Sequence, residues 1–158
     1  MDEKGISLVE LVISGALVGV LVVASGFSYR GWIGRYRVEK ITNELYADLM
    51  HARLKALQTN RQHYVMLEGS SYTVMEDTND NGCSDAGDSP LPGFPKPVPH
   101  ALCNNGTGNR IDFDKRGLMS QSKTLWFTSS FEPDYDCMKV SRARIIMGRY
   151  ENNACVVK

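Results

Sequence analysis

The chain has 158 residues, 42% of them hydrophobic, and its 18 basic and 18 acidic residues leave a formal net charge of zero. This length suits one soluble domain plus one membrane helix. The balanced charge excludes a global electrostatic field that would draw the chain to nucleic acid or to an acidic lipid surface.

An apolar segment close to the N-terminus dominates the sequence. From Ile6 to Ala24 every position is apolar or small except Ser7, Glu10 and Ser14. A helix needs about 20 such residues to cross a bilayer. A charged side chain inside such a segment is costly and is usually functional, so Glu10 requires a partner.

A short polar leader, Met1–Lys4, precedes Gly5, and Glu10 is the fifth residue after that glycine. This combination resembles the N-terminal signature of type IV pilins and type II secretion pseudopilins. The resemblance implies cleavage between Gly5 and Ile6 by a prepilin peptidase, methylation of the new Ile6 amine, and a pairing role for Glu10 in assembly. The alternative is an ordinary signal anchor that tolerates one acid near its end.

The charges that flank the apolar segment disagree with this resemblance. Lys4 is the one cation before the segment, whereas Arg30, Arg35, Arg37 and Lys40 follow it. Loop charge alone would place the C-terminal part in the cytoplasm. The resemblance implies the opposite, and we follow it: a single pass through the inner membrane, an exported C-terminal domain, and association with a filament after assembly.

Beyond this segment, apolar residues recur at three- and four-residue steps, which predicts an amphipathic helix with one buried face. The residues of this face are Ile41, Leu45, Leu49, Ala52 and Ala56. Thr59-Asn60 provides an end for the helix, since both residues are weak helix formers. Between the two helical parts, three glycines together with Tyr29 and Trp32 indicate either a flexible joint or a membrane–water boundary.

From His63 the pattern changes to short strands. His63–Glu68 and Tyr72–Glu76, separated by Gly69-Ser70, predict a hairpin. The other predicted elements are strands at Ile111–Phe113, Leu125–Thr128 and Met138–Met147, with turns at Lys115–Gly117 and Gly148. The segment Asp88–Gly108 is rich in Pro, Gly and Asn, and is either a loop ordered by a disulfide or a mobile one.

The predicted fold is α+β: a long N-terminal helix, half transmembrane and half amphipathic, packed on an antiparallel β-sheet domain. We expect a leader at 1–5, a transmembrane or filament-core helix at 6–28, an amphipathic helix at 29–58 and a β-rich exported domain at 59–158. The order of helix, hairpin, Asp-x-Asn-x-x-Gly loop, Phe113-x-x-x-Gly117 turn and basic strand ending in Gly148-Arg149 resembles GspH/FimT-type minor pseudopilins. The resemblance implies a pilin-like fold and assembly with other subunits into a type IV pilus or a type II secretion pseudopilus. No catalytic motif or phosphate-binding loop is recognisable, so we do not expect an enzyme.

One loop carries oxygen-bearing side chains at regular spacing. Counted from Asp77, they occupy positions one, three, five, nine and twelve, and glycine occupies position six; the residues are Asp77, Asn79, Asn81, Asp85 and Asp88. This is the spacing of a calcium loop, which makes calcium the one candidate cofactor. Position twelve is Asp rather than Glu, however, and no helix follows. The alternative is a solvated hairpin tip built on Asn81-Gly82.

A basic group lies near the C-terminus, with Arg142, Arg144 and Arg149 as its candidate DNA-binding residues. The resemblance to FimT-type pilins implies DNA binding for DNA uptake, through a motif of the form Gly-Arg-x-Arg. Gly148-Arg149 matches this motif, but Glu151 occupies the next basic place and would repel phosphate. The alternative is a solvated strand face.

The four cysteines all lie in the second half of the chain, without a Cys-x-x-Cys pair, and the three histidines are scattered, so a zinc site is not expected. In an exported domain an even number of cysteines indicates disulfides, with three possible connectivities. We favour Cys83–Cys103 and Cys137–Cys155, because each closes a local loop and would contribute about 3 kcal/mol. The alternative is free buried thiols.

Overall fold

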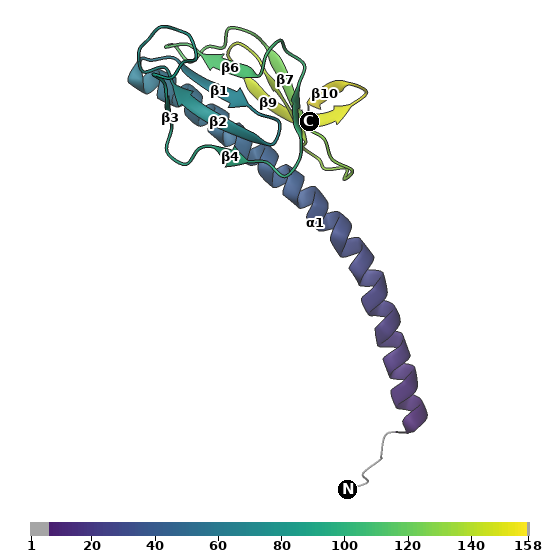
Figure 1. The fold of residues 1–158 in the computed structure, drawn as a ribbon. Coiled ribbons are helices and arrows are strands. Elements are labelled where there is room, and N and C mark those ends of the chain that lie inside the picture. The colour runs from purple at the N-terminus through teal and green to yellow at the C-terminus, as the bar shows by residue number, and fades with distance from the viewer. Residues whose placement is uncertain (1–6, 158) are drawn as a thin grey trace. The chain divides into compact units, whose positions relative to one another are not determined.

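The computed structural model describes residues 7–157 (Figure 1). A single long helix, α1 (Leu8–Thr59), precedes the β-strands, which confirms the predicted α+β class. The chain divides into two compact units, one ending at Gly34 and the other beginning at Arg35. The first half of α1 therefore belongs to one unit, and its second half belongs with the β-sheets.

The second half of α1 buries one face in the core of its unit. The buried residues are the predicted ones, together with Val38: Val38, Ile41, Leu45, Leu49, Ala52 and Ala56. Their three- and four-residue spacing places them on the same side of the helix. The helix ends where predicted, at Thr59, and Asn60 follows with a positive φ of 53°, a conformation that commonly terminates helices.

The first sheet contains the predicted hairpin. Strands β1 (His63–Leu67) and β2 (Ser71–Glu76) pair antiparallel, with His63 opposite Glu76 and Leu67 opposite Tyr72. On the other edge of β1 lies β6 (Arg110–Phe113), and β2 is flanked by the two-residue strands β3 (Ser89–Pro90) and β4 (Lys96–Pro97).

The second sheet has the order β10-β9-β8-β7-β5, with every pair antiparallel. Its strands are β5 (Leu102–Asn104), β7 (Lys123–Phe127), β8 (Cys137–Val140), β9 (Ile145–Glu151) and β10 (Ala154–Val157). Burial alternates along β7, where Leu125 and Phe127 enter the core that also contains the buried face of α1. This alternation is the pattern of a strand with one buried face.

Two predictions in this sheet are wrong. The predicted strand Met138–Met147 is two strands, β8 and β9, because a turn closed by hydrogen bonds between Ser141 and Arg144 interrupts it. Gly148 is not a turn residue: it lies inside β9, opposite Cys137. A Cβ atom at Gly148 would lie 2.1 Å from the carbonyl oxygen of Val156, so glycine is required for β10 to approach β9 this closely.

The proline-rich segment 88–108 is held by packing and ion pairs and not by the predicted disulfide. Its side chains Leu91, Val98 and Leu102 are buried in the core. Lys96 Nζ donates to Asp48 Oδ2 on α1 (2.7 Å) and pairs with Glu44 at 3.2 Å. Partial burial lowers the pKa of Lys96, but the hydrogen bonds to the two carboxylates outweigh it, so the pKa is raised overall.

A buried lysine fastens the end of this segment to the second sheet. Lys123 is 5% exposed, and its Nζ donates to the carbonyl oxygens of Thr107, Gly108 and Arg110 at 3.1, 2.9 and 2.7 Å. Burial lowers the pKa of Lys123. Its three N–H donors are satisfied by these carbonyls, so this side chain has a structural role.

Candidate functional site

The first half of α1 presents an apolar surface that its own unit does not cover. The large apolar side chains from Leu8 to Val23 are between 54% and 78% exposed. By length and composition, α1 is the one helix among residues 7–157 that could cross a membrane, and none of its most apolar window is buried. Exposed apolar surface of this extent marks a membrane or protein contact.

Glu10 lies within this apolar surface. Its side chain is exposed, and Ser14 Oγ donates to the backbone carbonyl of Glu10 at 2.7 Å, which leaves the carboxylate available. None of the ion pairs in the described part of the chain involves Glu10. The predicted processing residues Gly5 and Ile6 lie outside the described residues, so their roles stay predictions.

Two glycines on the same half of α1 were not used in the sequence analysis. Gly15 and Gly19 are four residues apart, and a Cβ atom added at either would meet no atom within 4 Å. Each glycine weakens a helix by about 1 kcal/mol relative to alanine, and nothing in this chain requires it. A pair of small residues at this spacing allows the backbone of a second helix to approach closely in a membrane.

Beyond this surface, Tyr29 and Trp32 stack with their ring centroids 6.4 Å apart, and both side chains are more than 60% exposed. Amphipathic aromatic rings of this kind are enriched at membrane–water boundaries.

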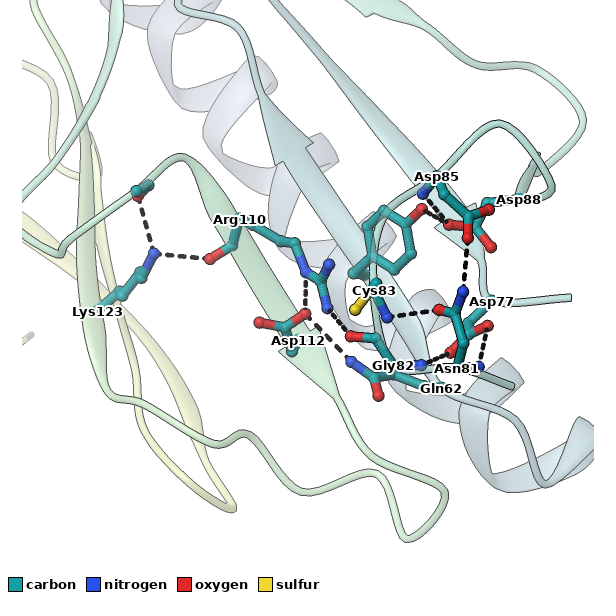
Figure 2. Close-up of polar contacts among 12 residues, drawn as sticks. Gln62, Asp77, Asn81, Gly82, Cys83, Asp85, Asp88, Arg110, Asp112 and Lys123 are labelled. Carbon is teal, nitrogen blue, oxygen red and sulfur yellow. Dashed lines mark hydrogen bonds and ion pairs between the residues drawn. The ribbon is translucent and has the colours of Figure 1, made fainter. Parts of the chain in front are cut away.

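The predicted calcium loop joins β2 to β3, and its side chains converge on one another. Nδ2 of Asn79 donates to both carboxylate oxygens of Asp85 (3.1 and 3.0 Å), and Nδ2 of Asn81 donates to Asp85 Oδ2 at 2.5 Å. The hydrogen bonds from Asn79, from the Gly87 amide and from Asn81 lower the pKa of Asp85. Figure 2 shows Asn81, Asp85 and Asp88 gathered at one point of the loop.

The first acid of the loop, Asp77, is 1% exposed and organises the turn. Its carboxylate accepts hydrogen bonds from the backbone amides of Asn81 (3.2 Å) and Gly82 (2.7 Å). The turn passes through positive φ at Asp80 and Gly82, 58° and 73°, and glycine adopts this conformation at little cost. The structure therefore brings all five predicted ligand residues into one compact loop.

Asp88, the last acid of the loop, is 9% exposed. Its Oδ2 accepts hydrogen bonds from the Tyr64 hydroxyl and from the Asp85 amide (2.9 Å), whereas its Oδ1 is buried without a hydrogen-bond partner. Burial, followed by the hydrogen bond to Asp88, raises the pKa of Tyr64 to about 12. In residues 7–157, no three side chains of His, Cys, Asp or Glu form a group that could hold a metal ion.

A polar cavity of about 530 Å³ adjoins this loop, and no motif in the sequence predicts it. Among its lining residues is Arg110, which pairs with Asp112 and donates to the carbonyl of Gly82 at 3.0 Å (Figure 2). Its guanidinium also lies over the Tyr64 ring. Arg110 thereby connects β6 to the predicted calcium loop between β2 and β3. Its guanidinium is committed to these contacts, so its charge is already compensated within the chain.

The three predicted DNA-binding arginines do not form one patch of free charge. Arg149 pairs with Glu132 at 3.4 Å and with Glu151 at 2.9 Å. Arg142 lines the polar cavity, together with Asp112 and Asp114. Arg144 is exposed in the turn between β8 and β9.

One predicted disulfide is confirmed and the other is wrong. Cys137 and Cys155 are bonded and connect β8 to β10 across β9. Cys83 and Cys103 are free thiols. Cys83 is exposed in the loop after β2, whereas Cys103 lies on β5 with its thiol 3.7 Å from Thr128 Oγ1.

A long helix with an uncovered apolar half and a second half packed on antiparallel sheets defines a pilin-like protein. The sequence model of the family described as Type II transport protein GspH matches residues 42–144, more than half of the chain. The chain belongs to this family, which confirms the predicted resemblance. Proteins of this family are structural subunits, and the chain is therefore a structural subunit of the pilin or pseudopilin type and not an enzyme.

Two solved structures resemble the chain in fold. Both are crystal structures of the type IV minor pilin FimU from Pseudomonas aeruginosa PAO1. One is 16% identical with a TM-score of 0.54 and covers 72% of this chain and 89% of FimU; the other is 17% identical with a TM-score of 0.53 and covers 69% and 90%. Among curated proteins none matches the sequence. At these identities the likeness to FimU shows the fold alone.

Proposed function

We propose that the chain is a minor pilin or pseudopilin subunit that assembles through the first half of α1 into a type IV pilus or a type II secretion pseudopilus. The observation that carries this proposal is the difference in burial along α1. Leu17 is 62% exposed in the first half, whereas Leu45 and Leu49 in the second half are fully buried. Membership of the GspH family supports the same role.

In this proposal the first half of α1 has two successive environments. Before assembly it crosses the inner membrane, with the leader in the cytoplasm and the residues after Gly34 exported. A prepilin peptidase then cuts after Gly5, and the new Ile6 amine is methylated. During assembly the helix leaves the lipid and packs against the helices of neighbouring subunits, where Gly15 and Gly19 let two backbones approach closely.

In this assembly Glu10 determines how the helices of two subunits are aligned. A carboxylate in an apolar environment is stabilised most effectively by a nearby cation, and its desolvation is costly without one. Since no ion pair in the described residues involves Glu10, we infer that its partner is the Ile6 amine of a neighbouring subunit. Such a pair forms at only one axial offset between two helices, so it also fixes their register.

The Cys137–Cys155 disulfide supports an exported location for the β-sheets. Disulfides persist in oxidising compartments such as the bacterial periplasm and are rare in the cytosol. The positively charged residues after the apolar run argue for the opposite orientation, and the disulfide outweighs them because it requires an oxidising compartment to form.

The processing steps are tested by mass spectrometry of the native product from membranes and from sheared filaments. We expect a chain that begins at Ile6 and carries one methyl group on its amine, in both fractions. Recovery of an unmodified chain with Met1–Gly5 still attached in the filament fraction would contradict the proposal.

DNA binding by Arg142, Arg144 and Arg149 is the alternative function, and no contact in the structure favours it. The ion pairs of Arg149 with Glu132 and Glu151 weigh against it, because a phosphate would have to displace both carboxylates. Fluorescence anisotropy with the full chain at low salt tests this alternative. An affinity for DNA that falls steeply with rising salt would establish phosphate contacts and support the DNA-binding alternative.

A further inference from the structure

The loop between β2 and β3 carries negative charge that the chain does not neutralise. Residues 77–88 contain four aspartates and no basic residue. Within residues 7–157, the ion pair that involves one of these acids is Lys115 with Asp80. Asp77, Asp85 and Asp88 are held by hydrogen bonds from neutral groups.

Asp88 provides the strongest indication that this loop binds a ligand. This carboxylate is nine-tenths buried, and its Oδ1 has no hydrogen-bond partner, although Oδ2 has two. A buried carboxylate oxygen without a partner is costly, and in native proteins it usually indicates a water or an ion. The oxygen belongs to position twelve of the loop, the position that closes the coordination sphere in calcium loops.

Asp85, whose backbone amide donates to Asp88 Oδ2, brings a second carboxylate to the same part of the loop. The Asp85 carboxylate receives the side-chain amides of Asn79 and Asn81 and the backbone amide of Gly87. In this conformation N–H donors surround the Asp85 carboxylate. The two ends of an asparagine amide have nearly the same shape, so a half-turn of each amide exchanges its nitrogen for an oxygen without moving the backbone.

We propose that this loop is a calcium site, in which Asp85, the free oxygen of Asp88 and the amide oxygens of Asn79 and Asn81 hold the ion. Asp77 does not contribute an open oxygen: its carboxylate accepts two backbone amides and positions the turn. Calcium accepts six to eight oxygen ligands of mixed type and completes its shell with water. Magnesium requires a tighter octahedron and keeps its own water, so it fits this ligand set less well.

Calcium binding at this site is weak, for two reasons. Only two carboxylates contact the ion, which agrees with the absence of a three-residue acidic group in the described chain. Turning the two amides also breaks the hydrogen bonds from Asn81 N to Asn79 Oδ1 (3.1 Å) and from Cys83 N to Asn81 Oδ1 (2.7 Å). We therefore expect a Kd of about 0.1–1 mM, the range of extracellular calcium modules.

The first experiment uses the full chain in detergent micelles after treatment with EDTA. Titration calorimetry with calcium chloride is expected to give a saturable heat, and about 5 mM calcium is expected to raise the melting temperature by about 2–5 °C. Magnesium at the same concentration is expected to give a clearly smaller shift. The absence of both heat and shift with calcium would overturn the proposal, and so would an equal shift with magnesium.

Matched variants assign the ligands. Asp85→Asn removes an exposed ligand charge and is expected to abolish the calcium-dependent shift. Asp80→Asn removes the same charge from the same loop, but Asp80 points to Lys115 and is not a ligand, so this variant is expected to retain the shift. A full shift in Asp85→Asn, or its loss in Asp80→Asn, would overturn the assigned site.

Discussion

The two halves of α1 are both helical, but the first half exposes its apolar side chains and the second half buries them in the core. In the first half, apolar side chains such as Leu8 and Leu21 are 78% and 66% exposed. In the second half, Leu45 and Leu49 are completely buried against the two sheets. Because burial of apolar surface is the main favourable contribution to folding, the second half is stabilised by its own chain. The first half requires lipid or another subunit.

The comparison also explains why the two halves have different sequence patterns. The second half is amphipathic because only one of its faces meets the core. The first half is apolar around its whole circumference, with Glu10 as the one charged residue from Leu8 to Tyr29. A helix that is apolar on all sides is buried on all sides in its functional state. This difference in pattern supports the proposal that the first half serves assembly, whereas the second half serves folding.

The largest effect that we expect comes from Glu10→Ala. The variant inserts into the membrane and folds, but its incorporation into filaments falls at least about a hundredfold, because removing one partner of a buried charge pair costs about 3–5 kcal/mol. The measurement is immunoblotting of the sheared filament fraction against the membrane fraction. Ser14→Ala is the matched control, because Ser14 Oγ donates to the backbone carbonyl of Glu10 and the substitution leaves the Glu10 carboxylate in place. Normal incorporation of Glu10→Ala would contradict the proposed pairing.

Two leucine-to-alanine substitutions, one in each half of α1, test which half contributes to the stability of the folded chain. Leu49→Ala creates a cavity in the core and is expected to lower the free energy of unfolding by about 2–5 kcal/mol. Leu17→Ala removes the same atoms from an exposed position and is expected to change the free energy of unfolding by less than about 0.5 kcal/mol in detergent. Urea denaturation followed by tryptophan fluorescence measures both values. Equal losses of unfolding free energy in the two variants would contradict the inferred difference between the two halves of α1.

The disulfide provides a smaller effect that is confined to the second unit. Cys137 and Cys155 are 18 residues apart, and a loop of this size contributes about 3 kcal/mol to stability. We expect the double variant Cys137→Ala/Cys155→Ala to lose about 2–4 kcal/mol while its membrane insertion is unchanged. Cys83→Ser, at an exposed free thiol, serves as the control and is expected to be neutral. A large loss in Cys83→Ser would indicate a role for that thiol in folding.

The smallest effect is a pH dependence that also belongs to the second unit. His63 is fully buried, and burial is the main reason why its pKa lies below 6.5; the Arg61 carbonyl and Glu76 oppose this shift. The unfolded chain therefore binds more protons below pH 6.5. Stability is at its full value above that pH and is lost as the pH falls through the lowered pKa.

The measurement is the urea midpoint at about pH 7.5 and about pH 5.5, which bracket an ordinary histidine. His63→Gln is expected to flatten the pH dependence, whereas His51→Gln, at an exposed position, is expected to preserve it. A flat profile in the unaltered chain would contradict the inferred effect of burial.

Those features that depend on local pattern could be predicted from the sequence. The buried face of α1 follows from the spacing of Ile41, Leu45 and Leu49, and the β1–β2 hairpin follows from two strand-type runs around Gly69-Ser70. The loop at 77–88 folds as a compact unit because its Asp and Asn side chains bond to nearby amides. Local bonds of this kind depend on neighbours in sequence, which the pattern contains.

Features that depend on distant contacts could not be predicted. Gly148 looks like a turn residue, yet it lies in β9 because β10 folds back against it. Cys83 and Cys103 are 20 positions apart, which suits a disulfide, but Cys83 lies in the exposed loop after β2 and Cys103 lies on β5, and both are free thiols. Similarly, Lys96 looks like a solvated residue between prolines, and only the fold places it beside Asp48. In each case the deciding neighbour is remote in sequence.

The central claim, that the first half of α1 packs against other subunits, is tested most directly by a photoreactive amino acid at Leu17 in assembled filaments. The account predicts a covalent product between two subunits, with the crosslink on the partner located by mass spectrometry within the apolar first half of its own α1. Crosslinks in the filament fraction that reach only lipid, or only the β-sheet surface of another subunit, would contradict it.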